Sequence, residues 1–245
     1  MPKISVIIPC CNYERYLEQC LMSVLLQRTE HEVEILIGDD CSDDSSFEIA
    51  KRFEEMYAAH GLSIVAYRNE HRMGEIANTD KLMRMAKGEY VAYLDADDYW
   101  IHPDKLQMQA EFLDENPGHS MCVTGYIQLT DDGFSPSTGK SYLIPSLPMT
   151  SERLAEGNPV SSSSSRMFRN YGSLYKEYFD NFPFSDWPIN FELSFKGEIG
   201  FLNTPTYVYR IHPASLTHNL SEEPAMFYRR QKVLSALLKY RMGRL

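Results

Sequence analysis

The sequence predicts an α/β fold in which a mostly parallel central sheet is flanked by helices. Two patterns indicate it: short apolar runs alternate with segments of helical periodicity through the first half, and polar, acid-rich stretches follow the apolar runs. Strands that alternate with helices are joined by right-handed crossovers and form a parallel sheet covered on both faces. Ligands of such sheets bind beyond the carboxyl ends of the strands.

The first two strand–helix units begin at residues 4 and 33. Residues 4–8 form an apolar run that Pro9 closes, and apolar side chains at helical spacing then predict a helix; these are Leu17, Cys20, Leu21, Val24 and Leu25. The second run, at residues 33–37, ends in Gly38-Asp39-Asp40. Ser45 suits the cap of the next helix. Three side chains of that helix are expected to face inward, namely Ile49, Phe53 and Met56.

Two further units complete the first half. A strand at residues 62–65 leads into a helix that ends at Lys87-Gly88, where the glycine suits a left-handed C-terminal stop. Residues 90–94 form the fourth strand, and Pro103 opens the fourth helix. Polar stretches follow all four strands, at residues 10–13, 39–42, 68–70 and 95–98. They are therefore expected to converge on one cleft at the carboxyl ends of the strands.

Residues 93–100, YLDADDYW, place three carboxylates directly after the fourth strand. No Lys or Arg lies between Gly88 and Lys105, and like charges this close raise each other's pKa unless a positive charge sits among them. Asp95 and Asp97 point to the same side of an extended chain. The pattern predicts a bound metal ion, and Mg²⁺ or Mn²⁺ suits carboxylate ligands. The alternative is that these aspartates form a turn and cap the helix that Pro103 opens.

Composition limits the class of protein. The 245 residues, 43% of them hydrophobic, can bury one large core. A formal net charge of −10 argues against a nucleic-acid partner. The five cysteines lack CxxC spacing and are expected to be reduced. Because no apolar run approaches the roughly 20 residues of a membrane span, the chain is expected to be soluble and cytoplasmic.

The second half is less periodic. Residues 134–150 show no clear pattern, and the serine run at 161–165 is expected to be a polar strand or a segment that faces the site. Order returns with a helix start at Asp186-Trp187-Pro188 and an apolar strand near residues 199–202. Residues 216–245 are expected to form a basic helical segment. It either docks on the core or lies on a membrane surface.

Four segments in order resemble the inverting glycosyltransferases of family 2. They are KISVIIPCCNYERYLEQCLMSVLLQ, EILIGDDCSDDSS, RNEHRMGEIANTDKLMRMAKGEYVAYLDADD and FSDWPINFELSFKGEIGFLNTPTYVYRIHPAS. The resemblance extends from Lys3 to about Ser215. It implies a GT-A fold, that is, a Rossmann-like domain over residues 1–215 with a nucleotide-sugar donor half at 1–130 and an acceptor half at 131–215.

The resemblance also implies roles for individual residues. Asp40 would contact the nucleotide base, with Pro9 and Asn12 shaping the pocket, and Asp95 would lie near the ribose. The complete expected sets are Pro9, Asn12, Asp40, Asn69 and Asp95 for the nucleotide, Asp97 and His212 for the metal, and Asp186 as the general base. The acidic residue that often precedes this aspartate is Ser185 here, which leaves the orientation of Asp186 open. Structural alternatives are helix caps at Asp40 and Asp186, and a packed histidine at 212.

The function expected from these features is metal-dependent, inverting transfer of a sugar from a nucleoside diphosphate, with UDP favoured, to an acceptor hydroxyl. The acceptor would be a glycan or lipid-linked glycan in surface glycan or polysaccharide biosynthesis, with contact to the inner face of the membrane through the C-terminal helix. Two alternatives remain. One is a nucleotide-sugar-binding protein of the same fold without transfer activity. The other is a phosphotransferase or phosphatase that uses the DxD motif, although in such phosphatases the motif normally follows the first strand.

Overall fold

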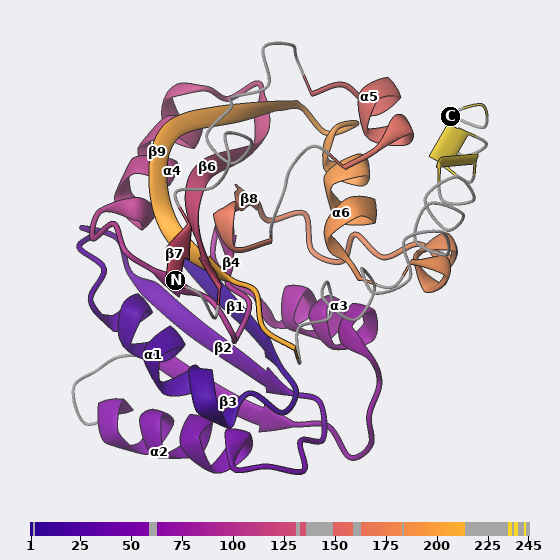
Figure 1. The fold of residues 1–245 in the computed structure, drawn as a ribbon. Coiled ribbons are helices and arrows are strands. Elements are labelled where there is room, and N and C mark those ends of the chain that lie inside the picture. Colours follow the sequence, from indigo (N-terminus) through magenta and orange to yellow (C-terminus); the bar gives the residue numbers. More distant parts are fainter. Residues whose placement is uncertain are drawn as a thin grey trace.

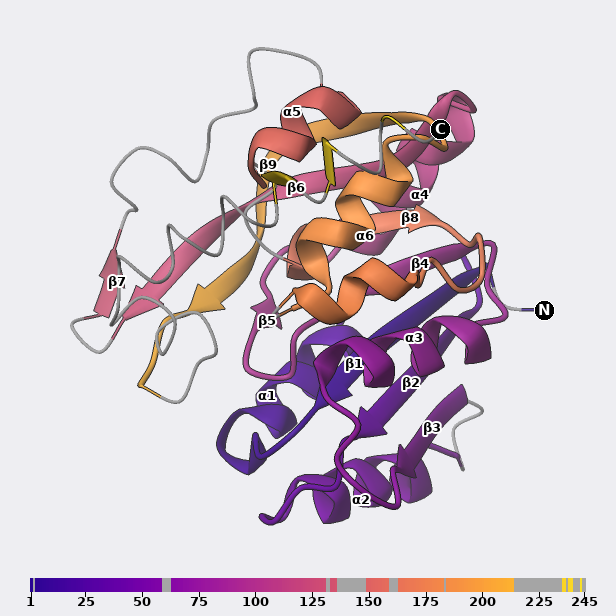
Figure 2. The ribbon, with the colours of Figure 1, turned by 90° about the vertical axis from the view of Figure 1, so that its right-hand side faces the viewer.

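One mixed sheet with helices on both faces organises this computed structural model (Figure 1 and Figure 2). The structure describes residues 1, 3–58, 63–130, 133–135, 149–158, 163–182 and 184–213, with five further residues between 235 and 243. The strands are β1 (Ile4–Cys10), β2 (Val33–Asp39), β3 (Ser63–Arg68), β4 (Tyr90–Tyr93), β5 (Tyr99–Trp100), β6 (His119–Thr130), β7 (Gly133–Ser135), β8 (Met167–Arg169) and β9 (Glu198–Arg210). The helices are α1 (Glu14–Leu25), α2 (Ser46–Ala58), α3 (Glu75–Met85), α4 (Lys105–Glu115), α5 (Ser151–Glu156) and α6 (Asp186–Leu193), with 3₁₀ turns η1 (Ser163–Ser165) and η2 (Glu177–Asn181).

The α/β prediction is confirmed, and the sheet is mixed rather than purely parallel. Its strand order is β3-β2-β1-β4-β8-β6-β9-β5, with β7 beside β6. The four strands expected from the first half are the parallel set β3-β2-β1-β4. The second half adds β8, which is antiparallel to both β4 and β6, and the long strand β9, which is parallel to β6. The topology of the first half was therefore readable from the sequence, whereas the added strands were not.

Strand β1 separates two hydrophobic cores because its side chains alternate between the faces of the sheet. Ile4, Val6 and Ile8 pack into the core covered by α1, α2 and α4. Ile7 packs into the opposite core, to which α3, α5 and α6 contribute. All seven residues of β1 are buried, as expected for a central strand covered on both sides.

One inward side chain predicted for α2 is wrong. Met56 is 52% exposed, while the buried side chains of this helix are Ser46, Ala50 and Phe53. Positions spaced by four and three residues share one helix face. The inward face runs from Ser46 through Ala50 and Phe53 to Tyr57, which packs against the core. Met56 lies beside this face and is exposed.

The predicted left-handed stop at Gly88 is also wrong, since the described non-helical glycines with positive φ are Gly74 and Gly172. Gly88 is needed for a different reason. A β-carbon there would lie 2.6 Å from the backbone nitrogen of Ser5 and 2.8 Å from the carbonyl carbon of Ile4. The Gly88 amide donates to Ser5 Oγ at 2.8 Å, and that hydroxyl donates to the buried Glu34 carboxylate at 2.5 Å. Gly88 therefore lets the chain approach β1 closely before β4 begins.

The second half brings its polar groups to the carboxyl end of β4. Strand β9 was expected near residues 199–202, but it extends over 13 residues to Arg210. The described part of the serine run forms η1, whose three serines are buried, and it contacts β4, β6 and β9. The rest of that run, at residues 161–162, and most of the irregular 134–150 stretch lie outside the described residues.

Few residues of the C-terminal segment are described. Ser235 Oγ donates to the Ala155 carbonyl in α5 at 2.6 Å, and Lys239 Nζ lies 3.8 Å from Glu156. Leu238 is fully buried in the core shared with α5 and α6. The expected membrane-facing surface of this segment falls on residues outside the described set. Among the residues that are described, no helix has the length and apolarity needed to cross a membrane.

We expect Gly88→Ala to destabilise the protein by about 1–3 kcal/mol, because the new methyl group must displace backbone atoms of β1. Urea unfolding monitored by circular dichroism measures this change. Gly118→Ala is the matched control, since a β-carbon there meets no atom within 4 Å. Equal unfolding midpoints for the two variants would show that β1 accommodates the methyl group.

Candidate active site

The acidic turn after β4 is fixed by contacts from the distant second half of the chain. Asp98 is fully buried, and its carboxylate accepts hydrogen bonds from the Arg210 backbone amide at 3.0 Å and from Ser164 Oγ at 2.7 Å. The Asp95 amide donates to the same Ser164 hydroxyl at 3.1 Å. The Asp98 amide closes the turn onto the Asp95 carbonyl at 3.0 Å. Asp98 therefore has a structural role that joins β4, η1 and β9.

Asp97 points away from this structural network toward His212. Its Oδ2 lies 3.1 Å from His212 Nε2, and both residues are at least nine-tenths buried. The His212 ring lies 4.7 Å from the Tyr16 ring and meets Tyr13 edge-on at 6.3 Å. The histidine is therefore packed against aromatic rings and is also in contact with the aspartate.

A divalent cation fits the chemistry of this pair. Carboxylate oxygen and imidazole nitrogen are both ligands of Mn²⁺, and two such donors 3.1 Å apart can bind one ion. His212 Nδ1 has no hydrogen-bond partner among the described residues. No cluster of three or more His, Cys, Asp or Glu suited to a metal occurs among those residues. Asp97 and His212 would supply two of the ligands of such an ion, and phosphate oxygens are suited to further positions.

Two arginines supply positive charge that the local sequence lacks. The Arg210 guanidinium donates to the carbonyl oxygen of Asp97 and to the side chain of Gln19. Arg166 is fully buried, and its guanidinium carbon lies 4.8 Å from the centre of the Tyr93 ring. The spacing of charges in the sequence indicated that a metal ion supplies the missing positive charge. In the structure, Arg210 and Arg166 also bring positive charge near the aspartates. Long-range contacts contribute part of the compensation.

The remaining negative charge still changes the protonation of the turn. Burial, followed by the charge of Asp97, raises the pKa of Asp95 well above its usual range. The same causes in the same order raise the pKa of Asp98. Arg166 opposes the shift at Asp95. The turn is therefore a place where an additional positive charge would be strongly favoured.

Asp186 is partly exposed at the first turn of α6, and its carboxylate is held by two donors. The Trp187 amide donates to Oδ1 at 2.6 Å, and Asn158 Nδ2 donates to Oδ2 at 2.8 Å. Burial raises the pKa of Asp186 to about 6, although Arg166 opposes this shift. The capping alternative assigned Asp186 to the N-cap, but that position belongs to Ser185. Asp186 thus has the environment of a carboxylate that exchanges a proton near neutral pH.

A ring of hydrogen bonds connects Asp186 with Asn158, Asn190 and Arg166. Asn158 Oδ1 accepts from Asn190 Nδ2 at 3.1 Å, and Asn190 Oδ1 accepts from Arg166 Nη1 at 3.0 Å. The same Arg166 nitrogen donates to the Asp186 carbonyl at 3.1 Å. Ser164 Oγ donates to Asp95 Oδ2 at 3.3 Å, and Arg166, two residues later, bonds the Asp186 carbonyl, so one short segment contacts both aspartates.

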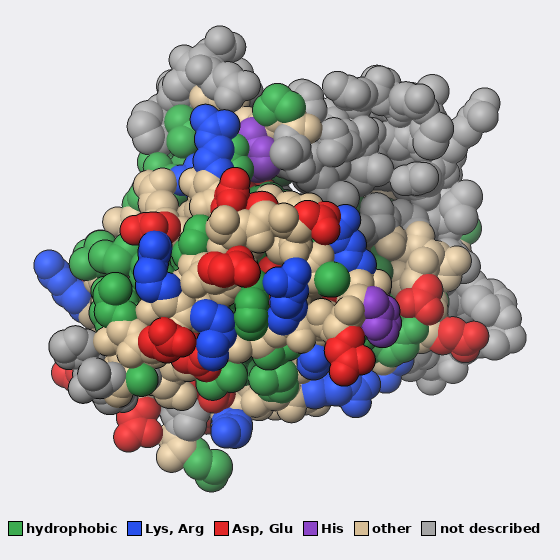
Figure 3. Space-filling view, turned by 90° about the horizontal axis from the view of Figure 1, so that it is seen from below, with side chains coloured by type: hydrophobic (Ala, Val, Ile, Leu, Met, Phe, Trp, Pro, Cys, Tyr) green, Lys and Arg blue, Asp and Glu red, His purple; other side chains and the backbone are tan. Residues whose placement is uncertain are grey.

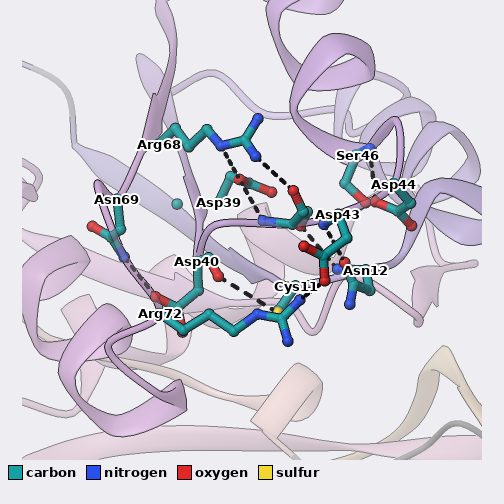
Figure 4. Close-up of polar contacts among 12 residues, drawn as sticks. Cys11, Asn12, Asp39, Asp40, Asp43, Asp44, Ser46, Arg68, Asn69 and Arg72 are labelled. Atoms are coloured by element: carbon teal, nitrogen blue, oxygen red, sulfur yellow. Dashed lines mark hydrogen bonds and ion pairs between the residues drawn. The ribbon is translucent and has the colours of Figure 1, made fainter.

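A second polar pocket lies at the ends of β1, β2 and β3 (Figure 4). Asp40 accepts hydrogen bonds from Asn69 Nδ2 at 2.9 Å and from the amides of Met73 and Gly74, each at 2.8 Å. Asn69 Oδ1 in turn accepts from Lys81 Nζ at 2.8 Å. Asp40 therefore ties the end of β2 to the start of α3, rather than capping the helix that follows it.

The remaining predicted nucleotide residues border the same pocket. Asn12 has a φ of 61°, and its Oδ1 accepts from the Asp43 amide at 2.7 Å while its own amide donates to Ser42 Oγ at 2.9 Å. Pro9 is buried in β1 opposite Gly38. The turn-forming role considered for the aspartate pair is taken by Asp39, whose Oδ2 accepts from the Ser42 amide at 3.1 Å.

The predicted nucleotide residues Pro9, Asn12, Asp40 and Asn69 lie at the ends of β1, β2 and β3. Asp95 and Asp97 lie in the acidic turn, with His212 beside Asp97. Asp186 belongs to neither group and lies at the start of α6. Several supporting residues were missed, namely Glu75, Asn158, Ser164, Arg166 and Asn190. Of these, only the serine was indicated in advance, through the expectation that the serine run faces the site. The surface around this part of the fold is mixed in charge: basic and acidic side chains are interspersed over the face seen in Figure 3.

Comparisons with known proteins relate this chain to glycosyltransferases. The chain is 38% identical over 133 residues to the putative teichuronic acid biosynthesis glycosyltransferase TuaG of Bacillus subtilis. The matched residues cover 54% of this chain and 50% of TuaG. Residues 1–349 of S. aureus TarS in complex with UDP-GlcNAc superpose with a TM-score of 0.66 at 21% identity, over 95% of this chain and 65% of that one. The mannosyltransferase PcManGT of Pyrobaculum calidifontis, in complex with GDP-Man and Mn²⁺, gives 0.65 at 16% identity, over 89% and 60%.

The chain spans between 32% and 64% of the lengths of eight curated relatives. The structural matches establish a shared GT-A glycosyltransferase fold. The sequence pattern of the family described as glycosyl transferase family 2 matches residues 5–173, which is most of the chain and includes both the Asp40 pocket and the acidic turn. The protein therefore belongs to glycosyl transferase family 2.

Proposed function

We propose that this protein is a metal-dependent, inverting glycosyltransferase that moves a sugar from a nucleoside diphosphate, with UDP favoured, to an acceptor hydroxyl. The observation that carries the proposal is the position of Asp186. The segment 164–166 joins Asp186 to the acidic turn beyond the carboxyl end of β4: Ser164 Oγ donates to Asp95 Oδ2 at 3.3 Å, and Arg166 Nη1 donates to the Asp186 carbonyl at 3.1 Å. Burial raises the pKa of the Asp186 carboxyl to about 6. A proton acceptor beside a donor-binding turn is what sugar transfer to a hydroxyl needs.

The donor half, residues 1–130, would hold the nucleotide. The nucleotide base would lie in the pocket bordered by Pro9, Asn12, Asp40 and Asn69, with the ribose near Asp95. Asp97 and His212 would bind Mn²⁺ or Mg²⁺ together with the diphosphate. The ion, when bound, would neutralise the charge that develops on the leaving diphosphate. Arg210 would hold the Asp97 backbone in place through its bond to the carbonyl oxygen.

Asp186 would remove the proton from the acceptor hydroxyl as that oxygen attacks the anomeric carbon. The bond from the sugar to the diphosphate breaks in the same displacement, so the configuration inverts. Asn158 and the Trp187 amide orient the carboxylate, and Arg166 stabilises its charged form. The acceptor would bind against residues 131–215.

Relatives support the substrate class. TuaG is named for teichuronic acid biosynthesis, which supports a surface glycan or polysaccharide, free or lipid-linked, as the acceptor. TarS was solved with UDP-GlcNAc, whereas PcManGT was solved with GDP-Man and Mn²⁺. A cytoplasmic location, with contact to the inner face of the membrane, would give access to both a nucleotide sugar and a lipid-linked acceptor.

We expect one nucleoside diphosphate, UDP in the first instance, to bind tightly only with Mn²⁺ or Mg²⁺, and Asp97→Ala to lose that metal-dependent binding. Calorimetric titration of UDP, GDP, ADP and CDP with and without metal measures this. Asp104→Ala is the matched control, because Asp104 follows the same acidic turn at the start of α4 without a side-chain cap bond. Binding that ignores both metal and mutation would remove the donor-site assignment.

Asp186→Asn is expected to reduce kcat by roughly 10²- to 10⁴-fold, because the amide cannot accept the acceptor's proton. Its affinity for the nucleotide in the calorimeter should stay within a few fold of wild type. Turnover is followed as release of the nucleoside diphosphate in the presence of acceptor. Nucleotide binding without any turnover in the wild type would favour the non-transferring alternative, and release of inorganic phosphate would favour a phosphatase.

The acid limb of kcat/KM is expected near pH 6. Burial raises the pKa of Asp186 to about 6, and the base is active only when deprotonated, so the rate should fall as the pH decreases through this value. A profile of kcat/KM between pH 4.5 and 8 under saturating metal measures it. A limb at the pH of an ordinary exposed carboxyl, near 4, would contradict the buried-base assignment.

A further inference from the structure

Ser185, directly before the proposed base, donates two hydrogen bonds to one distant carboxylate. Its backbone amide donates to Glu75 Oε2 at 2.7 Å, and its hydroxyl donates to Glu75 Oε1 at 2.6 Å. Glu75 is the first residue of α3 and lies 110 positions earlier in the chain. Because Ser185 is 1% exposed, water does not compete for these bonds. The start of α6 is therefore attached to the start of α3.

Glu75 is itself held in place. Its Oε1 also accepts from the Tyr93 hydroxyl at 3.0 Å and from Thr79 Oγ1 at 3.2 Å. The preceding residue, Gly74, has a φ of 87°, and its amide is bound by Asp40. A carboxylate at the first turn of a helix is also favoured by the helix dipole. This chain of contacts connects the nucleotide pocket at Asp40 to the base at Asp186.

We propose that Glu75 is a positioning residue for Asp186: by holding Ser185 through both of its carboxylate oxygens, it fixes the start of α6 and so the direction of the base. The inference rests on the proposed function, since it names a residue that sets up the same reaction. It explains how Asp186 is oriented in a chain with a serine at position 185. Position 185 has no carboxylate of its own, and Glu75 of α3 provides one beside it.

Two charged groups from different elements shift the pKa of Asp186. Arg166, from the segment before β8, lowers it, and Glu75, from α3, raises it. Asp186 in turn raises the pKa of Asp95 in the turn after β4. Removing the Glu75 charge while keeping its shape should therefore make the base more acidic and leave the pocket intact.

The test compares Glu75→Gln with wild type. We expect kcat to fall about 10- to 100-fold because the base is less well oriented, while KM for the donor and the calorimetric affinity for UDP stay within threefold. The acid limb of kcat/KM should move to lower pH. Ser185→Ala removes one hydrogen bond without changing charge, so it should lower kcat less and leave the limb where it is.

A measurement without substrate separates this proposal from the proposed function. Carbon-13 NMR of the aspartate carboxyls, with Asp186→Asn to assign the resonance, gives the Asp186 midpoint directly. Glu75→Gln should lower it. Asp80→Asn, which removes another carboxylate from α3 that contacts Arg84 and Ser173, is the control and should leave it unchanged.

If Glu75→Gln folds and leaves the Asp186 midpoint unchanged, the positioning proposal is overturned. The same holds if kcat per folded molecule stays within threefold of wild type. If the midpoint falls but no transfer occurs in wild type, the contact between Glu75 and the site of Asp186 stands and the proposed function is the part that fails.

Discussion

The burial of negative charge at the end of β4 is the constraint on which the rest of the site depends. Asp97 and Asp98 are nearly or fully buried, and Asp95 is partly so, within a span of four residues. Carboxylates removed from water are costly unless each is hydrogen-bonded or paired. The structure meets this requirement with groups from the far half of the chain. Ser164 and the Arg210 backbone bind Asp98, while His212 contacts Asp97.

This constraint also explains how the two halves are assembled. The parallel strands β3-β2-β1-β4 form one unit by local crossovers, and β4 would otherwise present its carboxyl end to solvent. Strand β8 pairs with β4, β9 pairs with the short strand β5, and the turn between β4 and β5 holds the aspartates. Each partner strand carries or adjoins an arginine, Arg166 before β8 and Arg210 at the end of β9. The same segments therefore attach the second half to the sheet and compensate the acidic turn.

The sequence could predict only those parts of the site whose interacting residues lie close together in the chain. The four strands and the residues that end them were predictable, because apolar periodicity and the polar residues after each run are local signals. The positive partners of Asp95 and Asp97 were not, because Arg166 and Arg210 lie outside any window in which charge can be counted. The prediction for Met56 was wrong because helical spacing alone does not determine which of two adjacent rows of side chains on α2 faces the sheet. The prediction for Gly88 was wrong because the local sequence does not show that the segment before β4 approaches β1 closely.

The two carboxylate groups of the site are held in physically different ways, and this separates their roles. The aspartates after β4 are locked by backbone amides and a buried serine, which suits groups that must stay fixed while a charged ligand arrives. Asp186 is bound by the side-chain amide of Asn158 and lies between opposing charges: Arg166 favours its ionised form and Glu75 disfavours it. Burial is the main cause that raises its pKa to about 6, Arg166 opposes the shift and Glu75 adds to it. For the proposed role as a base, a carboxyl with this pKa is largely ionised at neutral pH and still basic enough to take a proton.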